Sequence, residues 1–152
     1  MGKSQQSTTK RILKNGMTIQ WRYQNERVYF DVSAPTEGWL TIGFNENKGI
    51  VGAYLLMANV IGERAQVVEH YTMDQGKYLP IESLGMEPQV LDVDGSQTSG
   101  KTKVKFSIPI QKNNKYQKDL TKGSQYTLIL AYSRADDFQH HSMMRTHIPI
   151  TL

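Results

Sequence analysis

One segment near the C-terminus gathers several side chains that bind metals or ligands. The stretch DDFQHHSMMRTHI, residues 136–148, holds three of the chain's four histidines, two carboxylates, two methionines and one arginine. Carboxylate and imidazole together bind zinc and similar ions, whereas imidazole with thioether holds haem iron. The same stretch also fits the polar end of one β-strand that leads into the next. The segment is therefore either a ligand site or a corner between two strands.

The geometry of an extended chain limits what this segment can hold, because adjacent residues point to opposite faces. His140 and His141 would send at most one imidazole into a given pocket, and Asp136 and Asp137 would diverge in the same way. We therefore expect no transition-metal site. The simpler arrangement is a charge-assisted bond from Arg145 to one of the two aspartates across the turn, with one histidine facing a pocket.

The bulk composition restricts the class of protein. The 152 residues carry 18 Lys and Arg against 14 Asp and Glu, so the net charge is +4, and the basic residues are scattered. This pattern gives little support to nucleic-acid binding, and we expect none. The absence of Cys removes disulfides, thiolate metal sites and Cys nucleophiles. No window approaches the ~20 apolar residues of a transmembrane helix, so we expect no membrane span.

The first ten residues, MGKSQQSTTK, are polar and lack the apolar centre of a signal peptide. We expect residues 1–10 to be disordered or added for expression, ahead of one domain at 11–152. The rest of the chain shows alternation of period two, which is typical of half-buried strands. The apolar run AYLLMANVI predicts a central strand covered on both faces. Strands are expected at 17–23, 28–32, 40–44, 53–61, 65–73, 90–95, 101–110, 125–133 and 147–152.

About nine or ten short strands separated by turn signals predict an all-β, single-domain antiparallel β-sandwich. Only KNNKYQKDLTK, residues 112–122, is compatible with a short helix. The inward faces of the strongest runs predict a shared core that contains Trp21, Val28, Phe30, Phe106, Leu128 and Leu130.

The remaining candidate side chains have ordinary structural explanations. No phosphate-binding loop, nucleophile elbow or zinc-protease motif occurs, so enzymatic activity is not expected. Asp92 and Asp94 share a strand face near a turn and form either a carboxylate pair or a solvated strand end. His70 is expected to be a partly exposed strand residue, and Met57 to fill the core.

The order of several short motifs resembles the DOMON domain. These are Gly-Met-x-x-x-Trp at 16–21, Gly-Trp-x-x-x-Gly-Phe at 38–44, Val-Gly-Ala at 51–53, and His-x-x-x-Arg at 141–145 before a last alternating strand. The resemblance runs from about residue 12 to residue 152 and is strongest to bacterial single-domain members, which are usually exported. It implies an immunoglobulin-like sandwich with a pocket for haem b or a sugar, and a location outside the cytoplasm, in the periplasm or at the cell surface.

The resemblance also implies where haem iron would be held. In the haem-binding branch a Met before the Val-Gly-Ala motif and a His near the last strand are the usual ligands. The His falls on His141, or else on His140, but the Met falls on Ile50, which cannot bind iron. Met57 has the opposite strand parity to position 50. Met143, Met144 and His147 are the available substitutes.

We therefore expect a non-catalytic module of DOMON type that binds or senses a small molecule, haem or a carbohydrate. One alternative is an electron-transfer b-type cytochrome domain with His141 as the axial ligand. A second is a structural or interaction domain without a small-molecule ligand. The expected binding residues are His141, His140, Arg145, Trp39, Tyr54, Met57 and Met143.

Overall fold

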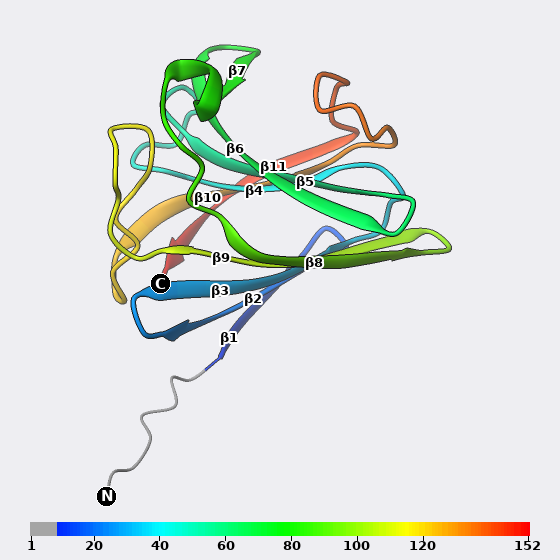
Figure 1. The fold of residues 1–152 in the computed structure, drawn as a ribbon, viewed down its shortest axis with the longest axis horizontal. Coiled ribbons are helices and arrows are strands. Elements are labelled where there is room, and N and C mark those ends of the chain that lie inside the picture. The colour runs from blue at the N-terminus through cyan, green and yellow to red at the C-terminus, as the bar shows by residue number, and fades with distance from the viewer. Residues whose placement is uncertain (1–8) are drawn as a thin grey trace, which may run out of the picture.

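The computed structural model describes residues 9–152, and its chain folds into two antiparallel β-sheets packed face to face (Figure 1). Sheet A has the strand order β1-β2-β3-β9-β8. Its strands are β1 (Lys10–Lys14), β2 (Met17–Gln24), β3 (Arg27–Ala34), β8 (Leu91–Thr98) and β9 (Lys101–Pro109). Sheet B has the order β11-β10-β4-β5-β6-β7. Its strands are β4 (Leu40–Asn45), β5 (Tyr54–Ile61), β6 (Arg64–Asp74), β7 (Lys77–Pro80), β10 (Gln125–Tyr132) and β11 (Met144–Thr151).

The predicted antiparallel sandwich is confirmed, with 11 strands in place of nine or ten. The two strands that the periodicity did not predict are β1 and β7, which are short and lie at sheet edges. Among residues 9–152 the one helical element is a 3-10 turn at Ile81–Leu84, inside the stretch that Gly and Pro residues mark as irregular. Residues 1–8 of the N-terminal segment expected at 1–10 lie outside the described residues. Lys10 already belongs to β1.

The segment 112–122, which the sequence left compatible with a short helix, forms no helix. Polar side chains there bond to nearby backbone groups: the backbone N–H of Lys112 donates to Oδ1 of Asp119, and that of Tyr116 donates to Oδ1 of Asn114, both over 2.9 Å. Such local bonds offer the backbone an alternative to helical hydrogen bonds, which explains the irregular loop.

The core lies between the sheets, as alternation in the strands requires. Each residue predicted for the shared core is buried: Trp21, Val28, Phe30, Phe106, Leu128 and Leu130. Phe30 stacks on Phe106 with ring centroids 5.5 Å apart and meets Phe44 of sheet B at 5.9 Å. These aromatic contacts join the two layers across the middle of the sandwich.

Strand β5 is the central strand that its continuous apolar run predicts. It pairs with β4 on one side and β6 on the other, and seven of its eight residues are buried. Residues 54, 56, 58 and 60 face sheet A, whereas residues 55 and 57 belong to a second apolar cluster on the outer face of sheet B. A strand with two buried faces needs a cover on its outer side, and the chain supplies one.

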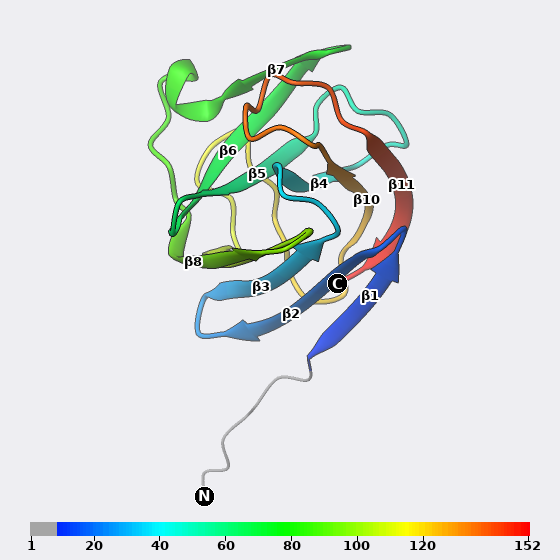
Figure 2. The same cartoon turned by 90° about the vertical axis from the view of Figure 1, so that its right-hand side faces the viewer.

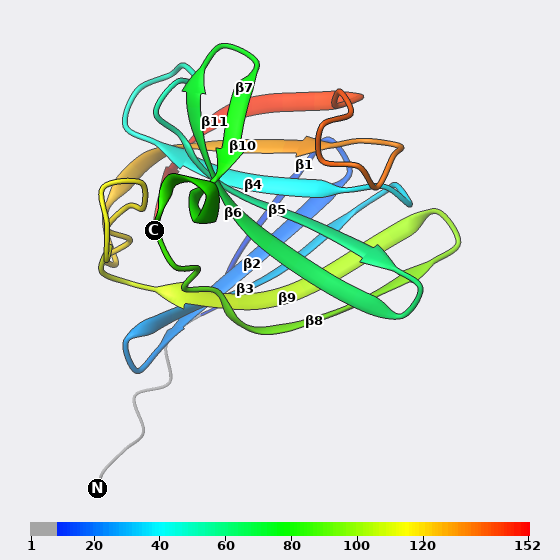
Figure 3. The ribbon, with the colours of Figure 1, turned by 45° about the horizontal axis from the view of Figure 1, so that its top comes forward.

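Two connections build this cover, and two hairpins meet at another side of the sandwich. The β10–β11 loop and the β6–β7 hairpin lie on the outer side of sheet B (Figure 2). On another side, the β5–β6 and β8–β9 hairpins cross one another (Figure 3), and a Cβ built on Gly95 of β8 would lie 3.0 Å from Cβ of Ala65 of β6. None of the residues from 9 to 152 forms a helix able to cross a membrane.

Candidate functional site

The β10–β11 loop, residues 133–143, carries most of the histidine-rich segment and is fastened at its base to the start of β4. The backbone N–H of Ser133 donates to the carbonyl of Trp39, and the N–H of Trp39 donates to the carbonyl of Ala135, both over 2.9 Å. The hydroxyl of Thr36 donates to the carbonyl of Ser133 over 2.6 Å. A Cβ at Gly38 would lie 2.2 Å from that same carbonyl oxygen, so only glycine permits this approach.

The far part of the loop lies across the outer face of sheet B. The side-chain amide of Asn59 donates to the carbonyl of Asp136 over 2.9 Å, and the Tyr78 hydroxyl donates to the carbonyl of Phe138. The Phe138 ring meets His70 edge-on with centroids 5.7 Å apart, and Tyr78 meets His70 at the same distance. Phe138 therefore covers the outer face of sheet B, where it contacts β6 through His70 and β7 through Tyr78.

Beneath this loop is the second apolar cluster of the protein, which we call the outer cluster. It contains Trp39, Ala53, Leu55, Met57, Ile129 and Ala131, with Ile50, Tyr78 and Phe138 packed against it. Trp39 is 3% exposed and Met57 is 2% exposed, so the cluster is closed to solvent in this conformation. The outer cluster is therefore a packed apolar and aromatic surface directly beneath the β10–β11 loop.

His70 lies in this region and is 1% exposed. The prediction of a partly exposed strand residue was wrong, because pairing with Leu55 turns His70 toward the outer face, where Phe138 and Tyr78 cover it. Its Nδ1 lies 3.0 Å from the carbonyl of Val68. Burial lowers the pKa of His70 below 6.5, against a smaller opposing effect of that hydrogen bond, so the imidazole is neutral near neutral pH.

Buried polar atoms without a protein partner concentrate on the same side of the molecule. Among residues 9–152 seven such side-chain atoms occur, and all but the Trp21 indole nitrogen belong to the outer face of sheet B or to the loop over it. The six are Trp39 Nε1, Thr41 Oγ1, Asn59 Oδ1, Thr72 Oγ1, Asp136 Oδ1 and His147 Nε2. Since buried polar atoms are nearly always paired with protein, water or a ligand, this face has the polar capacity to hold a bound molecule.

His147 presents the most specific chemistry of the six. It stands on β11 opposite Ile129, and its Nδ1 lies 2.9 Å from the carbonyl of Lys48 in the β4–β5 loop. A carbonyl can only accept, so Nδ1 carries a hydrogen, and in the neutral imidazole the lone pair is on Nε2. An imidazole fixed in this way by a backbone carbonyl is oriented to bind a metal through the other nitrogen.

The structure brings only some of the predicted binding residues together. Trp39 and Met57 share the outer cluster. Tyr54 lies on the opposite face of β5, in the main core, where its hydroxyl donates to Glu69 over 2.7 Å. Burial is the largest cause that raises the pKa of Tyr54 well above its ordinary value, and the Glu69 carboxylate raises it further. Tyr54 therefore serves the core in this structure.

The predicted residues of the loop, and Arg145 at the start of β11, point mainly to solvent. His140, His141 and Arg145 are exposed, and Met143 is 50% exposed. The segment from 137 to 143 is not extended: the backbone N–H of His140 donates to the carbonyl of Asp137 over 2.9 Å in a tight turn. The two adjacent histidines thus do not divide between a pocket and water.

The expected bond from Arg145 to Asp136 or Asp137 was wrong. Within residues 9–152 the ion pair closer than 4 Å joins Lys118 to Glu46, at 2.6 Å, and not Arg145 to either aspartate. Asp137 caps the turn by accepting from the N–H of Gln139 over 3.0 Å. Asp136 is half-buried, and burial raises the pKa of its carboxyl above 3.8. Residues 9–152 contain no group of three or more His, Asp or Glu side chains able to hold a metal ion.

Three residues of this face were not among the predicted binding residues, namely His70, Tyr78 and Phe138, and His147 was named only as a substitute ligand for iron. Strand parity places His147 beside Arg145 on one face of β11, and that signal was available in the sequence. His70 and Tyr78 depend on the register of β5, β6 and β7, and Phe138 depends on the path of a loop. Register and loop path cannot be read from one sequence.

Comparison with protein families decides what this arrangement belongs to. The model of the DOMON domain matches residues 13–133, which is most of the chain. The chain belongs to the DOMON family. The match takes in the Gly-Trp start of β4, the β4–β5 loop with Ile50, and the strands that carry the outer cluster.

Two solved structures share the fold of this DOMON domain at low sequence identity. The cytochrome b domain of pyranose dehydrogenase from Coprinopsis cinerea aligns with a TM-score of 0.72 and 9% identity, over 93% of this chain and 80% of that one. The cytochrome domain of Myriococcum thermophilum cellobiose dehydrogenase aligns with a TM-score of 0.66 and 8% identity, over 95% of this chain and 81% of that one. At such identities the comparison establishes the common architecture.

Proposed function

We propose that this DOMON domain is a non-catalytic module that binds haem b on the outer face of sheet B, beneath the β10–β11 loop. The observation that carries the proposal is His147, whose buried Nε2 has no protein partner and whose Nδ1 is fixed by the carbonyl of Lys48. The two structures of the same architecture are both described as cytochrome domains. The sequence has no strong catalytic motif, which supports a binding or sensing role.

The residues of the face fit haem in part. Trp39 and Met57 supply an apolar surface for a flat ring, and His147 supplies a lone pair for iron. Arg145 stands two residues from His147 on the same face of β11 and is exposed, which suits pairing with a propionate. Ile50 packs against the outer cluster at the position of the family's Met and supplies no ligand. The iron would therefore have one histidine ligand from this chain.

The chain's own residues would perform three tasks. Phe138 and Trp39 would exclude water, His147 would hold the iron, and the closed loop would control entry. Because the outer cluster is buried, haem must displace Phe138 before it reaches the floor. Bound haem supplies a redox-active iron, so transfer of single electrons is the second function that this face supports.

The resemblance assigns the axial role to His141, with His140 as its substitute, and this assignment is the alternative to His147 that the experiment tests. Both side chains are exposed on the loop, and a rearranged loop would turn them toward the face. Met143 lies in the same loop. A location outside the cytoplasm, in a bacterial periplasm or at the cell surface, follows from the family and is likewise proposed.

The carbohydrate that the resemblance also implies finds less support on this face. Stacking of a sugar needs an exposed aromatic ring, and the indole of Trp39 is 3% exposed. The outer cluster is apolar, which suits a porphyrin better than a ligand rich in hydroxyl groups.

Absorbance titration of the purified protein with haemin tests the proposal. We expect the wild-type protein to bind haemin saturably and one to one, and His147→Ala to lose the spectrum of bound haem. Phe138→Ala should take up haemin faster, because the ring that covers the outer cluster is absent. After reduction the wild type should lack the sharp split bands of His/Met haem, and Ile50→Met should acquire them. Gln139→Ala, on an exposed side chain of the same loop, is the control and should bind haemin as the wild type does.

Two outcomes would contradict the proposal in different ways. Failure of the wild-type protein to bind haemin specifically would remove haem as the ligand. Loss of binding in His141→Ala with retention in His147→Ala would keep haem and move the iron to the loop.

A further inference from the structure

The strands at one corner of the sandwich carry basic side chains and no acidic ones. The outermost strands β1 of sheet A and β11 of sheet B approach each other there (Figure 2), and the side-chain amide nitrogen of Asn15 lies 3.6 Å from Sδ of Met144. Strands β1, β2 and β11 contain five Lys and Arg residues and no Asp or Glu. The five are Lys10, Arg11, Lys14, Arg22 and Arg145. This corner therefore attracts an acidic partner.

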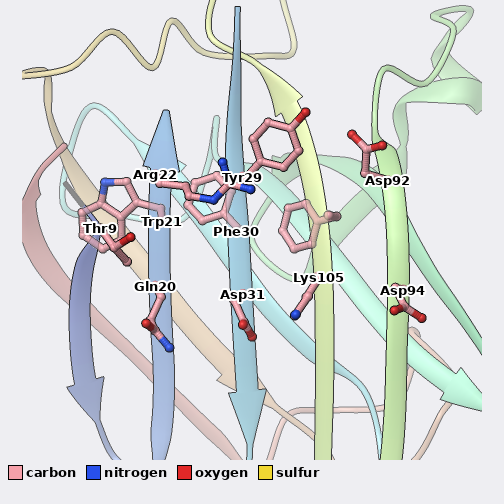
Figure 4. A pocket seen from close by; sticks show the side chains of 11 residues that line it. Thr9, Gln20, Trp21, Arg22, Tyr29, Phe30, Asp31, Asp92, Asp94 and Lys105 are labelled. Atoms are coloured by element: carbon pink, nitrogen blue, oxygen red, sulfur yellow. The ribbon is translucent and has the colours of Figure 1, made fainter. Parts of the chain in front are cut away.

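The carboxylates on the outer face of sheet A lie away from this corner. Asp31, Asp92 and Asp94 line a groove over β2, β3, β9 and β8, together with Gln20 of β2 (Figure 4). Arg11 pairs with Gln20, and Gln20 pairs with Asp31, so the first carboxylate of this row is two strands from β1, ~10 Å across the sheet. None of the three basic side chains of β1 forms an ion pair closer than 4 Å with another described residue. Their charges remain available to a partner.

The open side of β1 also has unpaired backbone groups. β1 pairs with β2 alone, across the two-residue turn at Asn15-Gly16. In such a hairpin the residues beside the turn exchange both hydrogen bonds, and every second residue along the strand does the same. The residues between them, Arg11 and Leu13, therefore turn their N–H and C=O groups away from β2. A strand from another molecule finds two donors and two acceptors on this edge.

The side chains of β1 set the pattern that an added strand must have. Leu13 is 65% exposed and shares one face of the strand with Arg11. Half-buried Ile12 shares the other face with Lys10 and Lys14. Residues directly opposite each other on neighbouring strands lie on the same face, so acidic residues suit the three cations and apolar residues suit Leu13 and Ile12. An antiparallel partner therefore reads acidic-apolar-apolar-acidic-acidic from its N-terminus.

Two other occupants fit this edge less well. A second copy of β1, paired antiparallel about Ile12, would bring Lys10 opposite Lys14, and like charges directly opposite each other are destabilising. An anionic lipid surface would use the charges but not the free backbone groups of Arg11 and Leu13. The acidic strand uses both.

We infer that β1 docks an acidic, extended segment of a partner protein, which adds to the five strands of sheet A as an antiparallel sixth. Main-chain hydrogen bonds at Arg11 and Leu13 give affinity, and the three cations select acidic side chains. Antiparallel pairing is slightly more stable per residue than parallel pairing, which favours that direction. The edge of β1 is not part of the outer cluster, so the inference does not depend on the proposed haem function.

Calorimetric titration of the purified protein with a designed peptide tests this inference. The probe is acetyl-Thr-Glu-Val-Ile-Glu-Glu-Thr-amide, which places Glu opposite the three cations and places Val and Ile opposite Leu13 and Ile12. One control peptide has Lys in place of each Glu. The other has Pro in place of Val, which removes the N–H that would bond to Leu13. We expect the acidic peptide to bind one to one, more weakly at high salt, and neither control peptide to bind.

Two variants of β1 locate the binding. Lys10→Glu/Lys14→Glu should weaken binding of the acidic peptide by about tenfold or more, the effect of losing ~1.4 kcal/mol. Leu13→Pro removes an outward N–H at a position that an edge strand tolerates, and should weaken binding to a similar extent. Lys101→Glu/Lys103→Glu, on exposed residues of β9, is the matched control and should bind as the wild type does. Thermal unfolding verifies the fold of each variant.

Each other outcome overturns the inference. Equal binding of the acidic peptide and its Pro derivative would show attraction by charge without an added strand, and binding of the Lys peptide would remove the charge complementarity. Sedimentation with phosphatidylglycerol vesicles completes the test, because protein that binds these vesicles and not the acidic peptide has a lipid-binding corner. Unchanged affinity in both β1 variants would place the peptide elsewhere. His147→Ala should bind the peptide normally, so failure here is distinct from failure of the haem proposal.

Discussion

The hydroxyl of Tyr54 donates a 2.7 Å hydrogen bond to Oε1 of Glu69, and both residues are buried in the sandwich. The same oxygen accepts from the side-chain amide of Gln117 over 2.8 Å. The other carboxylate oxygen accepts from the backbone N–H groups of Gln89 and Val90. One carboxylate thus joins β5 and β6 to the segment before β8 and to the loop at 111–119, with all of its oxygens engaged.

We predict that Tyr54→Phe lowers the free energy of unfolding by about 1.5–3 kcal/mol, the range for a hydrogen bond to a charged group. Glu69→Ala should cost more, because it leaves several buried donors without a partner. Urea denaturation measures both. Tyr132→Phe is the matched control, and equal stability of Tyr54→Phe and Tyr132→Phe would show that the Tyr54 bond contributes nothing.

His70 should make the stability depend on pH on the acid side. Its folded-state pKa lies below 6.5, so the unfolded chain binds a proton more readily than the native state does. The contribution of neutral His70 is therefore present above 6.5 and is lost as the pH falls through the lowered folded-state value. Urea midpoints across this range should fall less steeply in His70→Gln than in wild type. Gln139→Ala, on an exposed residue that does not titrate, should retain the wild-type slope, and identical slopes in all three proteins would contradict the prediction.

Gly38→Ala should destabilise the protein and displace the base of the β10–β11 loop. The added Cβ would lie 2.2 Å from the carbonyl oxygen of Ser133, which is backbone and is held by Thr36. Overpacking of this kind typically costs about 1–3 kcal/mol. Thermal unfolding measures the loss. Gly49→Ala is the control, since its Cβ would meet only a side-chain oxygen of Asn47 at 3.3 Å; similar melting temperatures for both variants would refute the role of Gly38.

Arg145→Ala should leave the stability within about 0.5 kcal/mol of wild type, because Arg145 is exposed and pairs with neither Asp136 nor Asp137. Denaturation in urea checks this directly. A loss of more than about 1 kcal/mol would indicate an ion pair at the loop that the structure does not contain. In the haem titration the same variant should weaken binding.

Much of the sandwich followed from the sequence, because burial imposes period two on each strand between two sheets. β5 was recognised as central since both of its faces are apolar. β1 was missed for the converse reason: in KRILK the alternation is short, and every side chain except that of Ile12 is exposed. It forms by pairing with β2 across the Asn15-Gly16 turn, where both residues have positive φ, of 51° and 86°.

The site was less accessible to sequence reasoning. Tyr54 and Met57 were assigned to one pocket, although three residues apart in a strand they face opposite sides, and the structure separates them accordingly. The charge pair at Arg145 assumed an extended corner, whereas the loop turns at Asp137. Phe138 had no periodic signal at all, because its position depends on hydrogen bonds from Asn59 and Tyr78, which are distant in the chain.

The strand order leaves four outermost strands, β1, β8, β11 and β7, each paired on one side only. The unpaired backbone N–H and C=O groups of such an edge can pair with a strand from another molecule, which starts aggregation. Here β1 carries Lys10, Arg11 and Lys14, β8 is bent by its bulge, and β11 contains Pro149, which lacks an N–H. β7 has four residues and ends at Pro80. These features hinder fibrillar growth separately from the stability of the fold, so a variant that straightens β8 or replaces Pro149 can become prone to aggregate while its melting temperature is unchanged.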